Sequence, residues 1–205
     1  IYVRGQPQDY DAWEAAGATG WGHAQADRLF RKIEHYEPGG ENRGKNGPMH
    51  LEEVAERFPV SDAFLRAAQE DGQPLNADYN SGDQEGVGYY QVLQHRGRRW
   101  SVVDGYMKPA AGRDNLKVEC GAHVTRLLFE GKRCVGVAYR QNGQEHTVRA
   151  RRETVLCLGA VQSPQLLELS GVGDPARLQS FNIPLVHAHA PVSYTHLTLP
   201  TIYSV

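Results

Sequence analysis

The 205-residue sequence is short of cysteine, of methionine and of any large excess of charge. Its formal net charge of −2 gives no reason to expect binding to nucleic acid or to an anionic membrane surface. No apolar run is long enough to cross a bilayer, so no transmembrane segment is expected. The three cysteines lack the spacing of a metal site, and their odd number favours a reducing compartment. We therefore expect a cytoplasmic protein without a metal centre, in which Cys120 and Cys157 are buried in strands.

Apolar residues make up 40% of the chain, which is enough for a packed core in one large domain or two small ones. The sequence starts without methionine, and its opening Ile-Tyr-Val-Arg-Gly reads like the middle of a strand. The chain is therefore expected to be a fragment of a longer protein.

The most informative stretch runs from residue 153 to residue 173. Residues 154–158 are apolar and rich in β-favouring types, which predicts a buried strand. Gly159 and Ala160 then form a corner with little side chain, and Ser163 and Pro164 are expected to cap and open a helix. Such a corner presents backbone N–H groups to an anionic cofactor. Because strand–glycine–helix junctions occur in most α/β proteins, a purely structural role stays open.

The first half of the chain reads as helices separated by loops. Helices are predicted at residues 9–16, 26–37, 61–70 and 101–109, and a strand is predicted at 88–95. Ser61 is expected to cap the third helix, with Phe64, Leu65 and Ala68 as its buried stripe. Residues 41–48 are rich in Gly and Asn. No Gly-Lys-Ser/Thr follows them, so they do not match a phosphate-binding P-loop, and a flexible cover loop is expected instead.

Charged clusters in this half suggest ligand sites only weakly. The carboxylates between residues 78 and 86, including Asp78, lack the spacing of an EF-hand and are expected to be solvated. Arg96, Arg98 and Arg99 lie in a predicted turn. We expect them to form a solvated face or internal salt bridges rather than a phosphate site.

From residue 115 the pattern changes to strand alternation, beginning with Leu116, Val118 and Cys120. Strands are predicted at residues 124–129, 134–139 and 147–150, and Asn142-Gly143 is a strong hairpin signal. This predicts a small antiparallel meander that leads into the strand at 154–158. Asp174 is expected to cap a last helix.

Residues 159–173 read Gly-Ala-x-x-Ser-Pro-x-Leu-Leu-x-x-Ser-Gly-Val-Gly. This resembles the second signature of the glucose–methanol–choline (GMC) flavoprotein oxidoreductases, with every position filled. The resemblance runs from about Tyr2 to Pro184, and residues 97–101, Gly-Arg-Arg-Trp-Ser, resemble the choline dehydrogenase and alcohol dehydrogenase branch. Residues 101–106 depart from that branch on the substrate side.

The resemblance implies an α/β with α+β fold class. Residues 1–112 would hold an amino-terminal extension, cover loops and part of a GMC substrate domain. Residues 113–190 would form part of a Rossmann-like FAD-binding domain, built from the antiparallel meander and a parallel strand.

The resemblance also implies an activity. The parent protein would use FAD to oxidise a small alcohol, choline-like or primary, to an aldehyde by hydride transfer to the flavin. Val124 would meet the adenine through its backbone. Gly159 and Ala160 would lie beside the adenosine and pyrophosphate, where a larger side chain would block the approach. Ser163 is a further cofactor-binding candidate, although a plain helix cap is preferred, and no catalytic residue is assigned because the family's histidine lies beyond this chain.

Several alternatives stay open. Tyr89, Tyr90 and Gln91 are candidates for the substrate side, but alternating aromatic residues in a strand are more often core. The chain could also be a non-catalytic α+β binding or structural module, or belong to an oxidase or lyase on the same scaffold. The electron acceptor and the substrate are not given by the sequence.

The end of the chain does not continue the family pattern. Residues 192–201 match the translation of a transposase-based sequencing adapter, so residues 191–205 are expected to be a non-native tail. The alternative is a genuine strand-like tail. On the adapter hypothesis, no chemistry is assigned to His196.

Overall fold

The computed structural model describes residues 1–189. The expected adapter-derived tail at 191–205 lies outside the described residues. By its internal packing the chain divides into two units, Ile1–Leu116 and Lys117–Val205, which we describe separately. The predicted domain boundary after residue 112 stays a prediction. Within the described range, no helix is long and apolar enough to cross a membrane.

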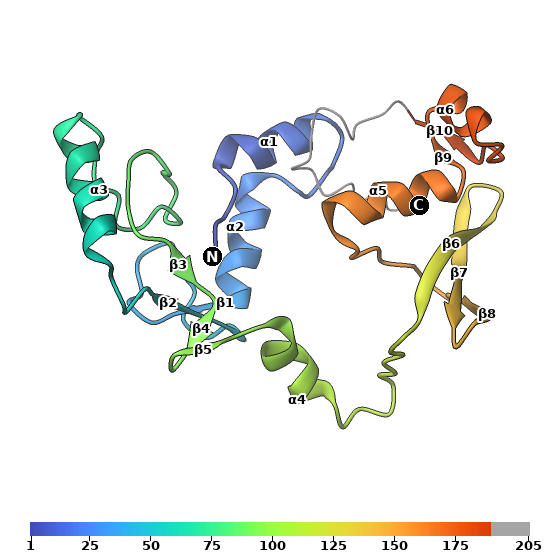
Figure 1. Ribbon diagram of the computed structural model, residues 1–205, viewed down its shortest axis with the longest axis horizontal. Helices are drawn as coiled ribbons and strands as arrows, with labels where there is room; N and C mark the ends of the chain where they lie inside the picture. The colour runs from blue at the N-terminus through green and yellow to red at the C-terminus, as the bar shows by residue number, and fades with distance from the viewer. Residues whose placement is uncertain (190–205) are drawn as a thin grey trace. The chain divides into compact units, whose positions relative to one another are not determined.

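The first unit combines helices with short strands (Figure 1). Its elements are α1 (Pro7–Ala15), α2 (His23–Ile33), β1 (Glu34–Tyr36), β2 (Met49–Glu53), α3 (Pro59–Glu70), β3 (Gln91–Val92), β4 (Gln94–His95), β5 (Arg98–Arg99), the π-helical turn η1 (Val103–Met107) and α4 (Lys108–Ala110). β1 pairs with β2 in parallel and β3 pairs with β2 antiparallel, while β4 and β5 form a separate hairpin.

One face of this small sheet carries the core of the first unit. Glu34 pairs with Met49 and Tyr36 pairs with Leu51 across β1 and β2, and all four side chains are buried. Because side chains alternate along a strand, the residues between these pairs point to the opposite face. Glu34 is the charged residue among these four. A buried carboxylate needs hydrogen-bond or ion-pair partners.

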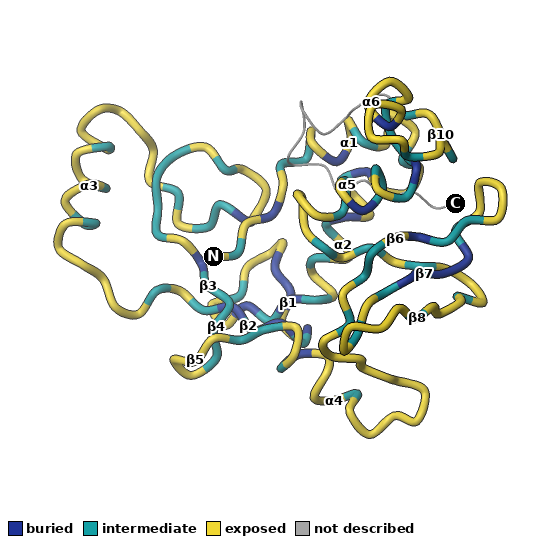
Figure 2. The backbone as a smooth tube through the Cα atoms, turned by 45° about the vertical axis from the view of Figure 1, so that its right-hand side comes forward, coloured by how far each residue is buried: buried dark blue, intermediate teal, exposed yellow. Residues whose placement is uncertain are grey.

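The helices of the first unit lie near their predicted positions but differ at their ends. α2 ends at Ile33, not at residue 37, because Glu34 is extended (φ −92°, ψ 150°) and begins β1. α3 begins at Pro59, after Phe58, rather than at Ser61. Its predicted buried stripe is wrong: Phe64 is 67% exposed and no residue of α3 is buried (Figure 2).

The second unit is built on an antiparallel sheet followed by helices (Figure 1). Its elements are β6 (His123–Glu130), β7 (Arg133–Gln141), β8 (Gln144–Arg149), α5 (Gly159–Leu169), β9 (Val172–Gly173), α6 (Pro175–Ser180) and β10 (His187–Ala188). The predicted meander is confirmed, in the order β6–β7–β8. Asn142 and Gly143 have φ of 51° and 78°, the positive values that a type I′ hairpin turn requires. Asp174 caps α6 as predicted, accepting a hydrogen bond from the Arg177 N–H at 2.8 Å.

Two predictions about residues 153–173 are wrong. Residues 154–158 form no strand, because no strand in the described part of the chain pairs with them, and Val155 is 72% exposed. Helix α5 starts at Gly159 rather than at Ser163, so Pro164 lies inside the helix. Proline has no N–H to donate, and the Ala160 carbonyl therefore loses its usual helical partner.

The cysteine prediction is also wrong. Cys120 and Cys157 are both exposed. The strands expected to bury them do not form: residues 111–120 are exposed throughout and contain no strand.

Candidate functional site

A left-handed corner opens helix α5. Gly159 has φ +87°, a conformation that residues with a Cβ rarely adopt. A Cβ built on Gly159 would meet nothing within 4 Å, so the space beside the corner is open. Leu158 stands at the N-cap position, and no side chain of the described residues caps the helix there. The first-turn N–H groups lack intrahelical acceptors, as in any helix, and remain available to a bound anion.

Ser163 supports this corner, although from a different position than predicted. It lies in the second turn of α5, and its Oγ accepts a hydrogen bond from the Leu158 N–H at 3.3 Å. This contact holds the backbone that enters the corner. Ala160, the other predicted residue there, is exposed in the first turn.

One hydroxyl fastens α5 to the sheet. The Ser170 Oγ accepts a hydrogen bond from the Leu127 N–H of β6 at 2.8 Å and donates one to the Leu166 carbonyl at 2.6 Å. Val124, the predicted adenine contact, lies three residues earlier in β6, where it is half-buried opposite Tyr139. The sequence analysis does not assign a role to Ser170. The feature that could have indicated one is its place in the motif, directly before Gly171.

In the first unit, the buried carboxylate of Glu34 is surrounded by donors. Arg4 donates to Oε1 through Nη2, Arg43 donates through Nε at 2.9 Å, and the Gly44 N–H donates at 2.6 Å. Arg43 also reaches Oε2 at 3.3 Å. Burial alone would raise the pKa of Glu34, but hydrogen bonds from Arg43, Gly44 and Arg4 outweigh it and hold the pKa below its usual value.

Arg43 connects this carboxylate to the rest of the unit. Its guanidinium is fully buried, forms an ion pair with Asp78, donates to Gln91 at 2.9 Å and stacks over the Tyr36 ring at 3.8 Å. The loop that carries Arg43 is thus anchored in the core, which corrects the prediction of a flexible cover loop. Asp78 is likewise a structural partner rather than a solvated loop residue. The prediction of a solvated arginine turn is confirmed, since Arg96, Arg98 and Arg99 are exposed.

The three residues proposed for a substrate side separate in the structure. Gln91 is buried at 2% exposure in the network around Arg43, which is a core role. Tyr89 and Tyr90 instead line an open groove of about 670 Å³, together with Phe64 of α3. The Tyr89 hydroxyl donates to Asp62 at 2.7 Å. The groove is as large as small-molecule sites usually are, about 300–1,000 Å³.

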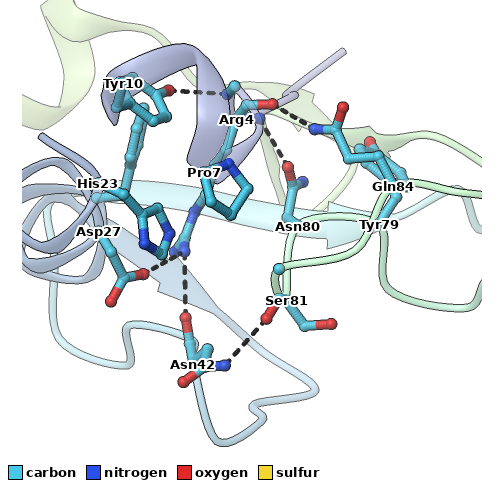
Figure 3. A pocket seen from close by; sticks show the side chains of 13 residues that line it. Arg4, Pro7, Tyr10, His23, Asp27, Asn42, Tyr79, Asn80, Ser81 and Gln84 are labelled. Carbon is cyan, nitrogen blue, oxygen red and sulfur yellow. Dashed lines mark hydrogen bonds and ion pairs between the residues drawn. The ribbon is translucent and has the colours of Figure 1, made fainter. Parts of the chain in front are cut away.

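A second, smaller cavity of about 120 Å³ lies beside Arg4 (Figure 3). Several of its polar groups hydrogen-bond to one another, although the Nε of Arg4 is buried without a partner among the described residues. The Arg4 N–H donates to the Asn80 Oδ1 at 2.7 Å, the Arg4 guanidinium donates to Asp27 at 3.1 Å, and Gln84 donates to the Arg4 carbonyl. Its volume is below that of usual small-molecule sites, about 300–1,000 Å³.

Comparison with known proteins decides the family. The model of the GMC oxidoreductase family matches residues 1–192. The chain belongs to the GMC oxidoreductase family. This confirms the resemblance first seen in residues 159–173.

Named GMC relatives agree with the branch inferred from the sequence. Mitochondrial choline dehydrogenase of Homo sapiens is 44% identical over 192 residues, covering 93% of this chain and 32% of that protein. Alcohol dehydrogenase [acceptor] of Pseudomonas putida is 40% identical over 191 residues, covering 91% and 35%. The chain therefore spans about a third of the length of these relatives. Since one of them is named mitochondrial, the expected cytoplasmic location stays a prediction.

Solved GMC-type structures share the fold. Pyridoxine 4-oxidase from Mesorbium loti superposes with a TM-score of 0.82 at 32% identity, covering 91% of this chain and 37% of its own. An FAD-dependent oxidoreductase from Chaetomium thermophilum gives 0.81 at 28% identity, covering 92% and 35%. The mixed α/β fold class of a GMC flavoprotein is thereby confirmed.

The corner of this GMC chain fits the phosphate of a dinucleotide. The space over Gly159 is open, and a side chain there would project into it; the first turn of α5 has no side-chain cap among the described residues. Backbone N–H groups at such a position bind phosphate through hydrogen bonds and the helix dipole.

Proposed function

We propose that this chain is part of an FAD-dependent oxidoreductase that oxidises the CH–OH group of a small alcohol to an aldehyde. The observation that carries the proposal is the open, left-handed corner at Gly159 within a complete GMC signature. The identities of 44% and 40% to a choline dehydrogenase and an alcohol dehydrogenase support a choline-like or primary alcohol.

Each predicted cofactor residue has a defined part in this proposal. Gly159 and Ala160 leave room for the pyrophosphate and adenosine beside the first turn of α5. Ser163 holds the entering backbone through Leu158. Val124 offers the backbone of β6 to the adenine. When bound, FAD would supply the hydride acceptor for oxidation of the alcohol carbon.

On the substrate side, we propose that Tyr89 and Tyr90 form part of a wall that excludes water. Both line the groove beside α3, and the Tyr89 ring is held from two directions. Its hydroxyl donates to Asp62 at 2.7 Å, and Arg57 lies over the ring at 4.7 Å. A fixed aromatic wall orients a small substrate at low entropic cost. No described residue is assigned as the proton acceptor.

The test is to express the open reading frame that contains this sequence and to record its visible spectrum anaerobically, before and after addition of choline or simple primary alcohols. A flavin spectrum that bleaches supports the proposal and begins to name the substrate. A folded, colourless product would refute it and leave the alternative of a non-catalytic α+β module. A Tyr89→Phe variant, which keeps the ring, should retain the flavin spectrum and change mainly the response to substrate.

An oxidase on the same scaffold is a second candidate, favoured by the structural match to a pyridoxine 4-oxidase. The two candidates differ in how the reduced flavin is reoxidised. Admitting air to the bleached sample distinguishes them: rapid recovery of the spectrum with release of hydrogen peroxide indicates an oxidase. Slow recovery that an added artificial acceptor accelerates indicates a dehydrogenase.

A further inference from the structure

Two histidines stand side by side on the outer face of the β1–β2 pair. The parallel register places His35 opposite His50, between the buried pairs on the other face. Their ring centroids are 4.6 Å apart. Glu37 follows His35 by two residues, and its Oε1 lies 3.7 Å from the His35 Nε2. One ligand atom from each of the three residues lies within 4.8 Å of the other two.

A third histidine and a tryptophan enclose this group. The His95 ring of β4 lies 4.0 Å from the His50 ring, and Trp100 meets both rings edge-on at 4.9 and 5.2 Å. Trp100 is itself fixed, because its Nε1 donates to the Pro48 carbonyl at 2.7 Å. The indole forms an apolar wall beside the imidazoles, which limits access of water to them.

The buried nitrogens of this group are a second observation. The Nδ1 atoms of His50 and His95 are shielded from solvent and have no hydrogen-bond partner within the described chain. A buried polar atom without a partner costs free energy. A metal ion or a bound water that such an ion holds would supply the missing partner.

We propose that His35, Glu37 and His50 form a binding site for a divalent transition metal ion, with Zn²⁺ or Cu²⁺ as the preferred occupants. Two imidazoles and one carboxylate are ligands that these ions favour, and three protein ligands leave one position for water or another small ligand. His95 and Trp100 line the site without being required as ligands.

The required adjustment is small. Ligand atoms at about 2.0–2.2 Å from a tetrahedral ion stand about 3.4 Å apart. The three ligand atoms lie within 4.8 Å of one another, so they need to approach by at most about 1.4 Å. The side chain of Glu37 is 58% exposed and can change rotamer, and strand pairing holds the backbones of His35 and His50 side by side. His50 comes from a different strand than His35 and meets it only through the β1–β2 register, which is why no spacing pattern predicted a metal site.

The test uses the 205-residue chain prepared without an affinity tag, titrated with ZnCl₂ and with CuCl₂ by calorimetry, and with MgCl₂ as the hard-ion control. We expect one Zn²⁺ or Cu²⁺ per chain and no response to Mg²⁺. Because Trp100 touches His50, bound Cu²⁺ should quench tryptophan fluorescence. Trp100→Phe should remove most of the quenching and leave the stoichiometry at one.

Variants separate this site from adventitious binding. Glu37→Gln changes an exposed side chain, so it should keep the wild-type circular dichroism while weakening binding by at least about tenfold. His50→Gln should abolish the stoichiometric binding. His123→Gln, an exposed histidine of β6 in the other unit, is the matched control and should change nothing. No stoichiometric binding to the wild-type chain, or affinity unchanged in both Glu37→Gln and His50→Gln, would overturn the proposal.

Discussion

Replacing Glu34 by glutamine tests the role of the buried charge network. Glutamine has the same shape, but it removes the negative charge that faces Arg4 and Arg43. In wild type, the Glu34 Oε2 accepts a hydrogen bond from the Arg43 Nη2. The glutamine amide NH₂ would take the place of Oε2, so two hydrogen-bond donors would face each other. The three hydrogen bonds at Oε1 can persist on the amide oxygen, so the expected loss is that of the charge pair.

The magnitude follows from the partners that remain. Breaking a buried ion pair by removing one member costs about 3–5 kcal/mol. Arg4 keeps Asp27 and Arg43 keeps Asp78, which favours the lower end of that range. A loss of about 3 kcal/mol corresponds to a fall of about 6–12 °C in Tm for a chain of this size.

The measurement is urea and thermal unfolding of the 205-residue chain followed by tryptophan fluorescence. Trp13, Trp21 and Trp100, the three tryptophans, all lie in the first unit, so the signal reports the unit that holds Glu34. Glu56→Gln, at an exposed position after β2, is the control and should stay within about 0.5 kcal/mol of wild type. A Glu34→Gln variant as stable as this control would refute the reasoning.

The pH dependence gives an independent check. The pKa of Glu34 is lower in the folded chain than in the unfolded chain, so its contribution to stability is present above the unfolded pKa. That contribution is lost as pH falls through the folded pKa. Wild type should therefore lose stability relative to Glu34→Gln on acidification below about pH 4.5, and the two curves should converge. Parallel curves from pH 7 to pH 3 would contradict this assignment.

Three further outcomes are expected. Gly159→Val, which forces a Cβ into a left-handed conformation, should weaken FAD binding by the full-length apoenzyme about tenfold in a fluorescence titration. Ser170→Ala leaves the Leu127 N–H without its acceptor and should destabilise the second unit by about 1–3 kcal/mol in unfolding followed by circular dichroism, with Ser180→Ala as control. Gly136→Ala would place a Cβ 2.1 Å from the Val148 carbonyl oxygen, so it should lower the Tm for unfolding of the β6–β7–β8 sheet.

Local chemistry explains what the sequence predicted well. The Asn142-Gly143 turn and the Asp174 cap depend on residues within a few positions of each other, and both formed as expected. The GMC signature likewise sits in one continuous stretch, and its corner at Gly159 has the open geometry that its residues suggested.

The failures share a physical cause, which is dependence on distant partners. Residues 154–158 have the composition of a strand, but a strand needs a neighbour to accept its hydrogen bonds, and none of the described residues supplies one. Asp78 was expected to be solvated, and the loop that carries Arg43 was expected to be flexible. Their buried contacts depend on Glu34 and Gln91, which are distant in the sequence. The pairing of His35 with His50 depends on a parallel register that no local rule gives.

The exposed stretch at residues 111–120 also has a practical consequence. It contains Arg113 and Lys117, both exposed, close to the boundary between the two units. The hydrogen bonds around Glu34 all lie before this stretch, and the β6–β7–β8 sheet lies after it. Brief tryptic digestion should therefore cut here first and yield two fragments that retain their own secondary structure. The same position suits ligation of separately isotope-labelled halves, so that each unit can be followed by NMR without signals from the other.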